Sequence, residues 1–221
     1  MHRRDALLIY QILHRRYDDG SPRHFLRFEN PYQVLVLTIL SAQTTDRQVN
    51  EIAPRLFAKY PGPEDLALAD PEILESIIRS TGFYHDKARH LIGAATAITR
   101  DFGGEVPRTL KDLIALPGVG RKTANIVLHH AFGIDEGIAV DTHVRRTSRR
   151  IGLSDHADPD RIEEDLRVLF PKECWGDLNY LLIRHGRETC TARNPKCGEC
   201  VIRDHCRYYR EVVSGKKERI A

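Results

Sequence analysis

The sequence predicts an all-α protein. Apolar residues recur at helical spacing in nearly every segment, and no stretch shows the sustained alternation with β-branched residues that is typical of strands. Prolines and glycines punctuate these segments, with Asp-Pro pairs where two helices should begin and single glycines where others should end. A chain of 221 residues is long enough for one domain or two small ones with a real core.

The first part of the chain predicts five helices. Periodicity places them at residues 5–17, 31–40, 49–60, 71–79 and 87–98. The second is apolar nearly all round, which is typical of a helix at the centre of a domain. Asp46 is the expected N-cap of the third helix and Asp70 that of the fourth, while Pro61-Gly62-Pro63 breaks the chain between them.

A glycine-rich stretch, Leu116-Pro117-Gly118-Val119-Gly120, separates two further predicted helices, at 111–116 and from Gly120 to Gly133. Proline ends the first helix, and the two glycines permit backbone conformations or close approaches that a Cβ would forbid. The unpaired N–H groups at the start of the second helix then form an anion site suited to a nucleic-acid phosphate. A plain helical hairpin without a ligand is the alternative.

The last part of the chain predicts three more helices. Asp141 precedes a helix at 142–151, and amphipathic helices follow at 159–170 and 175–185. The helix at 142–151 carries a cluster of four positive charges: Arg145, Arg146, Arg149 and Arg150. We expect half or more of these arginines only to be solvated at the surface, and one or two of them to reach phosphates. Residues 208–217 are expected to form a frayed, exposed tail.

The five cysteines all lie in the last third of the chain. An odd number in a tight cluster argues against a secreted disulfide framework and favours a metal site. Four of them have the spacing x6, x2 and x5: Cys190, Cys197, Cys200 and Cys206. Four thiolates hold either one zinc ion or one [4Fe–4S] cluster, and chemistry alone leaves both open. Cys174 falls outside this spacing and is expected in the core.

Charge and hydropathy exclude several classes of protein. The net charge of +3 is too small for a polycation that coats DNA, so nucleic-acid binding requires a local patch. The sequence contains no run of about 18 apolar residues, so it predicts no membrane span. The basic N-terminus is not followed by the apolar core of a signal peptide. The protein is therefore expected to stay in the compartment where it is made.

The nine residues from Leu116 to Ala124 together resemble the helix-hairpin-helix of the DNA base-excision glycosylases. Lys122, followed by Val140-Asp141-Thr142-His143, narrows the resemblance to the endonuclease III family, and the match extends from Leu40 to Cys206. The cysteine spacing matches that family's cluster loop, which implies a [4Fe–4S] cofactor. The family further implies a base excision repair enzyme, a bifunctional DNA glycosylase and abasic-site lyase. It would remove oxidised or ring-saturated pyrimidines and cut the strand by β-elimination.

This resemblance also implies two helical lobes. Residues 22–134 would form a six-helix barrel ending in the hairpin, and residues 1–21 with 135–221 the iron–sulfur lobe. Double-stranded DNA with a damaged base or abasic site would lie in the cleft, between Lys122 and Asp141. We expect a monomer that works in the cytoplasm at the nucleoid, without a membrane partner.

Lys122 is the expected nucleophile, attacking the sugar to form a Schiff base. A phosphate-binding lysine is the alternative. An amine attacks only when unprotonated, whereas a free lysine has a pKa of about 10.4. The dipole of the helix N-terminus, Arg121 and partial burial would all favour the neutral amine. Asp141 would accept the proton and stabilise positive charge on the sugar, and its alternative role as N-cap is compatible with both.

The family also implies a set of DNA contacts. Gln43 would fill the gap left by the extruded base. The alternative is that the stretch from Ser41 to Asp46 is only a polar turn between helices. Phe83 follows a glycine and is either a wedge inserted between bases or a core residue. The remaining expected contacts follow from the residues themselves and are to phosphates, while the cluster loop has the alternative role of only cross-linking the C-terminal end: Gly118, Gly120, Arg193 and Lys196.

Three rival functions remain. The first is a uracil or thymine mismatch glycosylase, and a panel of duplexes with defined lesions would distinguish it from an enzyme for oxidised pyrimidines. A non-catalytic helix-hairpin-helix module would have no need of Lys122 and Asp141 together, and borohydride trapping would identify it. An iron–sulfur electron carrier would not need the hairpin.

Overall fold

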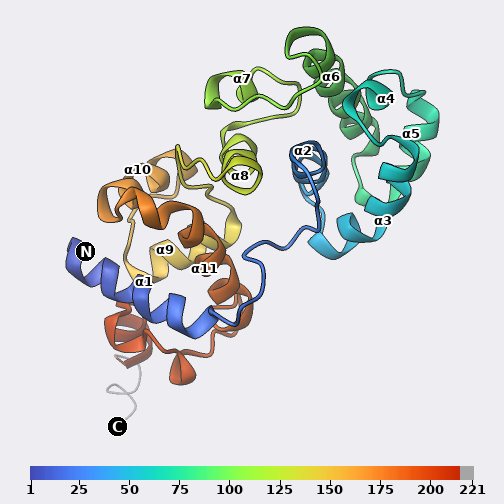
Figure 1. Cartoon of the computed structure of the whole chain (residues 1–221). Helices are drawn as coiled ribbons and strands as arrows, with labels where there is room; N and C mark the ends of the chain where they lie inside the picture. Colours follow the sequence, from blue (N-terminus) through green and yellow to red (C-terminus); the bar gives the residue numbers. More distant parts are fainter. Residues whose placement is uncertain (215–221) are drawn as a thin grey trace. The chain divides into compact units, whose positions relative to one another are not determined.

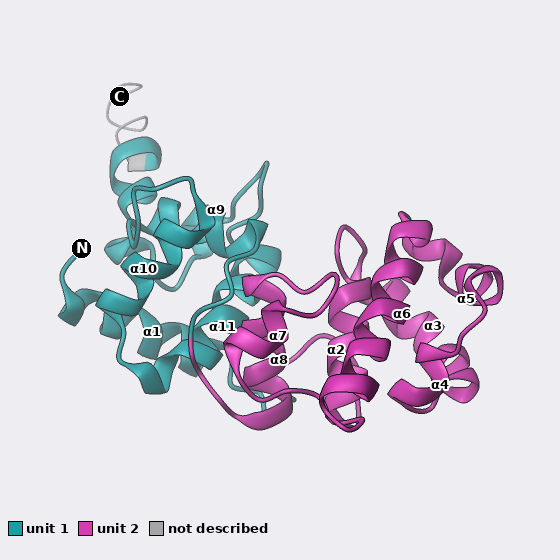
Figure 2. Cartoon of the chain, turned by 90° about the horizontal axis from the view of Figure 1, so that it is seen from above, with its two compact units in different colours: residues 1–23, 137–221 teal, residues 24–136 magenta. Residues whose placement is uncertain are grey.

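The structure, a computed structural model, describes residues 1–214, and every regular element in that range is a helix. The all-α prediction is therefore confirmed. The chain divides into two compact units, which we call unit 1 (residues 1–23 and 137–221) and unit 2 (residues 24–136) (Figure 1; Figure 2). The expected boundaries, after residues 21 and 134, lie two residues before these divisions.

Unit 2 is built from seven α-helices and one short 3-10 helix within residues 24–136. In chain order they are α2 (Pro31–Leu40), α3 (Asp46–Lys59), α4 (Pro63–Ala67), α5 (Pro71–Ile78), η1 (Arg79–Thr81), α6 (Tyr84–Asp101), α7 (Leu110–Ile114) and α8 (Arg121–Phe132).

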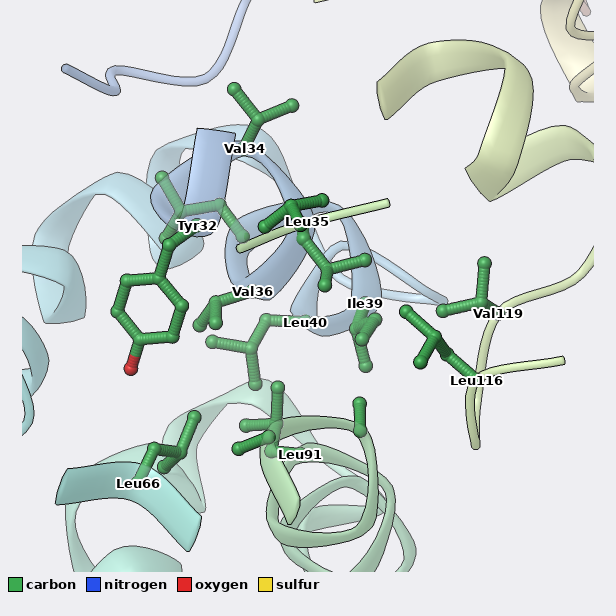
Figure 3. Packing of buried hydrophobic residues seen from close by; sticks show 14 of the residues in the cluster. Tyr32, Val34, Leu35, Val36, Ile39, Leu40, Leu66, Leu91, Leu116 and Val119 are labelled. Carbon is green, nitrogen blue, oxygen red and sulfur yellow. The ribbon is translucent and has the colours of Figure 1, made fainter. Parts of the chain in front are cut away.

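Helix α2 provides the centre of the unit 2 core. Its N-cap Asn30 accepts a hydrogen bond from the N–H of Gln33, and Pro31 occupies the first helical position. Eight of its ten residues are buried, as the all-round apolar sequence predicts. Leu116 and Val119 of the glycine-rich stretch belong to the same cluster (Figure 3). The hairpin is thus anchored directly on the core.

Two details of unit 2 differ from the prediction. Asp46 is the first residue of α3 rather than its cap, because the hydroxyl of Thr45 accepts the N–H of Gln48 at 3.3 Å. The predicted break at 61–63 leads directly into α4, which the periodicity missed because five residues complete little more than one turn.

Unit 1 joins the two ends of the chain. Its described elements are α1 (Arg3–Tyr17), α9 (Thr142–Ile151), α10 (Pro159–Leu169), η2 (Lys172–Cys174), α11 (Trp175–Glu188), η3 (Cys197–Glu199), η4 (Arg203–His205) and η5 (Tyr209–Ser214). The hydroxyl of Tyr17 lies 3.1 Å from Nδ1 of His185, and Arg184 donates to the carbonyl of Tyr17 at 3.2 Å. These bonds fasten α1 to α11.

The C-terminal segment also differs from the prediction. Residues 209–214 form a π-helix rather than a frayed tail, and Arg150 stacks over the ring of Tyr208 at 5.0 Å. The rest of the expected tail, residues 215–217, lies outside the described residues. No helix within residues 1–214 combines the length and the apolar character needed to cross a bilayer.

Candidate active site and cluster site

The turn between α7 and α8 is held by packing within unit 2. Leu116 and Val119 are only 3% and 5% exposed. Gly118 has a φ of +77°, and a Cβ at this position would lie 2.6 Å from Cβ of His90 on α6. The fold itself therefore requires glycine at Gly118.

Gly120 differs, because nothing in the fold requires it to be glycine. It is the N-cap of α8 with a φ of −90°, and an added Cβ would meet nothing within 4 Å. Having no side chain, Gly120 leaves the first-turn N–H groups of α8 without a capping acceptor from that residue. This arrangement is suited to an anion that approaches the backbone closely.

Lys122 is the second residue of α8, and its side chain is exposed. The partial burial that the sequence predicted at this position is therefore not observed. The residue lies in the first turn of α8, near the partial positive charge of the helix N-terminus and next to Arg121 in the sequence.

Asp141 caps α9 in unit 1. Its Oδ1 accepts the N–H of Val144 at 2.7 Å, which confirms the predicted cap. Within residues 1–214 no hydrogen bond reaches its second carboxylate oxygen. The backbone just before Asp141 is also held in place, since Asn179 donates to the carbonyl of Ala139 at 2.6 Å. The carboxylate is thus fixed through one oxygen and available through the other.

Gln43 and Phe83 share an unusual backbone conformation. They are the non-glycine residues with positive φ in the described part of the chain, at 55° and 47°. Such conformations are strained and cluster at functional sites. The Gln43 side chain is exposed, and that of Phe83 is 64% exposed. The core alternative for Phe83 is therefore wrong.

Lys87 connects the two loops that carry these residues, a role that periodicity alone does not predict. Its side chain is 4% exposed, and Nζ donates to the carbonyl of Leu40 at 2.9 Å, to Oγ1 of Thr44 at 2.7 Å and to the carbonyl of Thr81 at 2.8 Å. Thr44 also donates to Thr81 at 2.5 Å. A signal was present in the sequence, because Lys87 occupies the apolar stripe of α6 where a charge needs partners.

The four clustered cysteines line one cavity in unit 1. Within residues 1–214, no group of three or more histidine, cysteine, aspartate or glutamate side chains is close enough to hold a single metal ion. Four thiols that line one cavity are the donors that a metal cluster requires. Cys174 lies outside this cavity, buried in η2.

The electrostatics of the thiols also fit a cationic group. Burial raises the pKa of Cys200 to about 11, and burial followed by the neighbouring thiols raises the pKa of Cys197. Burial likewise raises the pKa of Cys206. Four thiolates would be unfavourable here without positive charge between them, and iron ions would supply that charge.

Two arginines of α9 hold the loop that begins at Cys190. Arg146 donates to the carbonyls of Gly186 at 2.8 Å and Cys190 at 3.1 Å. Arg150 donates to the carbonyls of Thr191 at 2.7 Å and Ala192 at 2.9 Å, and to Sγ of Cys190 at 3.5 Å.

The role of these two arginines was not anticipated. Arg146 and Arg150 donate hydrogen bonds to backbone carbonyls instead of only being solvated at the surface. Two of the four arginines of α9 therefore stabilise the fold.

The segment between Cys190 and Cys197 presents two cations. Arg193 and Lys196 are both exposed. The backbone N–H of Lys196 donates to the carbonyl of Thr189 at 2.9 Å, which closes the loop at its base. The loop is therefore short, pinned and positively charged.

Two family descriptions match the chain. Residues 36–172 match the HhH-GPD superfamily of base excision DNA repair proteins, and residues 190–206 match the iron-sulfur binding domain of endonuclease III. Endonuclease III of Synechocystis sp. is 50% identical over 82% of this chain and 83% of that protein. Endonuclease III of Thermotoga maritima is 40% identical over 85% of this chain and 87% of that protein.

Solved structures give the same result. A non-covalent endonuclease III–DNA complex has a TM-score of 0.89 at 36% identity, covering 97% of this chain and 99% of that one. A trapped endonuclease III–DNA covalent intermediate has a TM-score of 0.89 at 37% identity, covering 96% and 99%. A thermostable thymine-DNA glycosylase has a TM-score of 0.81 at 28% identity, covering 94% and 97%.

Proposed function

Because the chain belongs to the endonuclease III family, it is a base excision repair DNA glycosylase and abasic-site lyase, and we propose that Lys122 is its nucleophile. The observation that carries this proposal is an exposed lysine in the first turn of α8, directly after a turn anchored in the core. The protein binds DNA and holds a [4Fe–4S] cluster. We assign the helical barrel domain to unit 2 and the cluster domain to unit 1.

The reaction begins at C1′ of a nucleotide flipped out of the duplex. Nζ of Lys122 forms a bond to C1′ while the bond from C1′ to the damaged base breaks, and the base leaves with a proton. One proton moves from the nitrogen to O4′ as the C1′–O4′ bond breaks and the sugar ring opens, which leaves a protonated Schiff base at C1′. Loss of a proton from C2′ then breaks the C3′–O bond, so the strand is cut 3′ to the lesion.

Asp141 supports both halves of this chemistry. Its free carboxylate oxygen accepts the proton that the lysine must lose, and its charge stabilises the positive charge that develops on the sugar. The bond from Oδ1 to the N–H of Val144 keeps the group in one position, so little reorganisation is needed during the reaction.

The two strained residues of unit 2 act on the opened duplex. Gln43 fills the space that the extruded base leaves, and Phe83 inserts between bases as a wedge. Their exposure and left-handed backbone support these roles. The phosphate contacts are Gly118 and Gly120 at the hairpin and Arg193 and Lys196 on the cluster loop.

Cys190, Cys197, Cys200 and Cys206 hold the cluster, which when bound cross-links the C-terminal segment through its thiolates. Arg150 positions the start of this segment through Cys190 and the two residues after it. The chain's own residues thereby orient the cluster loop toward its phosphate contacts.

We propose oxidised or ring-saturated pyrimidines in double-stranded DNA as the substrates, processed by a monomer. The similarity to a thymine-DNA glycosylase favours a mismatch activity as the second candidate. A panel of duplexes, each with one defined lesion, separates the two by which base is released.

Borohydride trapping tests the nucleophile. Wild-type protein with a lesion-containing duplex should give a covalent adduct, because borohydride reduces a Schiff base to a stable amine. Lys122→Gln should give neither adduct nor strand cleavage yet still bind DNA. The matched control Lys111→Gln, an exposed lysine of α7, should react like wild type. Full trapping by Lys122→Gln would move the nucleophile elsewhere, with the N-terminal amine as the next candidate.

A further inference from the structure

A positively charged cavity of about 710 Å³ lies along the exposed face of α9 in unit 1. Five arginines line it, against two carboxylates, and Thr142 at the start of α9 also lines it. The charged side chains that line this cavity sum to +3, which equals the net charge of the whole chain, so the excess positive charge of the protein is concentrated here.

Three of these arginines have duties within the fold. Arg146 and Arg150 hold the cluster loop through its carbonyls. Arg207 is paired with the carboxylate of Asp155 and donates to the carbonyl of Arg149 at 2.9 Å. Structural bonds therefore explain why these three side chains are arginine.

Arg145 and Arg149 have no such duty. Both are exposed, and within residues 1–214 neither side chain forms a hydrogen bond or an ion pair. They are four residues apart on one face of α9, where like charges destabilise a helix by about 0.2–0.5 kcal/mol. The fold gains nothing from this pair, whereas an anionic ligand would be held by both.

We propose that Arg145 and Arg149 bind backbone phosphates of the duplex on one side of the lesion. The proposal rests on the proposed function, because it places the cavity beside the catalytic carboxylate. Thr142, which lines the cavity, is the residue after Asp141. From Thr142 to Arg149 the helix rises about 10 Å, which corresponds to about three phosphates of one strand.

A polymer fits these observations better than a free anion. The two arginines are exposed, and their backbone positions lie about one helical turn apart along α9. A free phosphate at two exposed arginines competes with water and salt, while successive phosphates of a strand engage both side chains with charge-assisted hydrogen bonds. These two side chains extend the grip on DNA beyond the hairpin and the cluster loop.

The salt dependence of binding to duplex DNA tests the proposal. The slope of log affinity against log salt should be shallower by about 1.8 for the double variant Arg145→Gln/Arg149→Gln than for wild type, because each phosphate contact contributes about 0.9. Between about 50 and about 200 mM salt, wild type should lose about 12-fold more affinity than the variant. The difference should be equal for lesion and undamaged duplexes.

A matched control removes the same charge elsewhere on unit 1. Arg3→Gln/Arg161→Gln changes two exposed arginines of α1 and α10 and should leave the slope unchanged. Shortening the duplex on one side of the lesion should weaken wild type to the level of the Arg145/Arg149 variant and leave that variant unaffected.

Three outcomes would overturn the proposal. Equal slopes for the Arg145/Arg149 variant and wild type would leave the pair without DNA contacts. Equal changes of the salt slope in the two double variants would show that only the net charge of the protein matters, and not the position of Arg145 and Arg149. Competition by inorganic phosphate at constant ionic strength, with unchanged DNA slopes, would assign the cavity to a free anion. If wild type failed to excise any lesion, the proposed function would fall, while the slopes would still test the cavity.

Discussion

Replacing Lys87 by methionine should separate the positioning of the two exposed loops from the chemistry. Lys87→Met keeps the length of the side chain but removes the donors to Leu40, Thr44 and Thr81. An unsatisfied buried acceptor costs about 1–3 kcal/mol. Thr81 keeps its bond from Thr44, and loss of the buried ammonium returns part of the cost. We therefore expect unit 2 to be destabilised by about 2 kcal/mol, or by about 6–10 °C in Tm.

The activity should fall further than this stability change explains. The loops that carry Gln43 and Phe83 lose their common anchor at Lys87, and a misplacement of about 1 Å costs about 10²-fold in rate. Single-turnover base excision should therefore drop by about that factor at a temperature where the variant stays folded, while the affinity for undamaged duplex changes little. The matched control Lys59→Met, at an exposed lysine of α3, should keep wild-type stability and rate.

The stability of this variant should also respond differently to pH. Burial lowers the pKa of Lys87 to about 8, below the value of about 10.4 for an unfolded lysine. Between these two values the unfolded chain binds more protons, so this group makes the free energy of unfolding rise with pH, by up to about 3 kcal/mol. The stability difference between wild type and Lys87→Met should widen across that window. Unchanged excision by folded Lys87→Met would refute the positioning role.

Four further predictions concern the active site and the cluster. Asp141→Asn keeps a capping oxygen and should keep fold and DNA binding while losing most excision of an intact lesion; equal loss on a preformed abasic site would make Asp141 chiefly a proton acceptor. Gly120→Ala should leave Tm unchanged but weaken binding to lesion and undamaged duplexes alike, because its Cβ meets only the ligand; normal binding would contradict this. Phe83→Ala should impair lesion processing without lowering Tm, since the ring is exposed; a lower Tm with full activity would mark it as structural. Cys197→Ser should lose iron and soluble protein, whereas Cys174→Ser should keep the iron load of about four per chain; bound zinc without iron after anaerobic purification would exclude the cluster.

Local rules made most of the fold predictable. Asp70 and Asp141 cap helices as expected, and so does Asp158, the aspartate of the second Asp-Pro pair, because an N-cap depends only on a side chain and the next three residues. The error at Asp46 has the same origin, since Thr45 beside it is also a good cap and the sequence does not rank the two.

What the sequence did not predict depends on contacts between distant residues. Lys87 meets a partner 47 residues away, and Arg150 meets carbonyls 41 and 42 residues further along the chain. Periodicity places such residues on a helix face but does not name their partners. The exposure of Lys122 has the same cause, because burial depends on the packing of the whole unit.

The joining of α1 to α11 has a consequence for how the protein is made. Unit 2 is complete once residue 136 has emerged from the ribosome, whereas α1 must wait for residues 184 and 185 to find its bonding partners. The last cluster cysteine, Cys206, follows residue 136 by 70 residues, which is about 4–14 s of synthesis. During that interval the nascent chain carries a folded hairpin unit and an unpaired N-terminal helix. Iron delivery then completes unit 1, whose two parts are synthesised before and after unit 2.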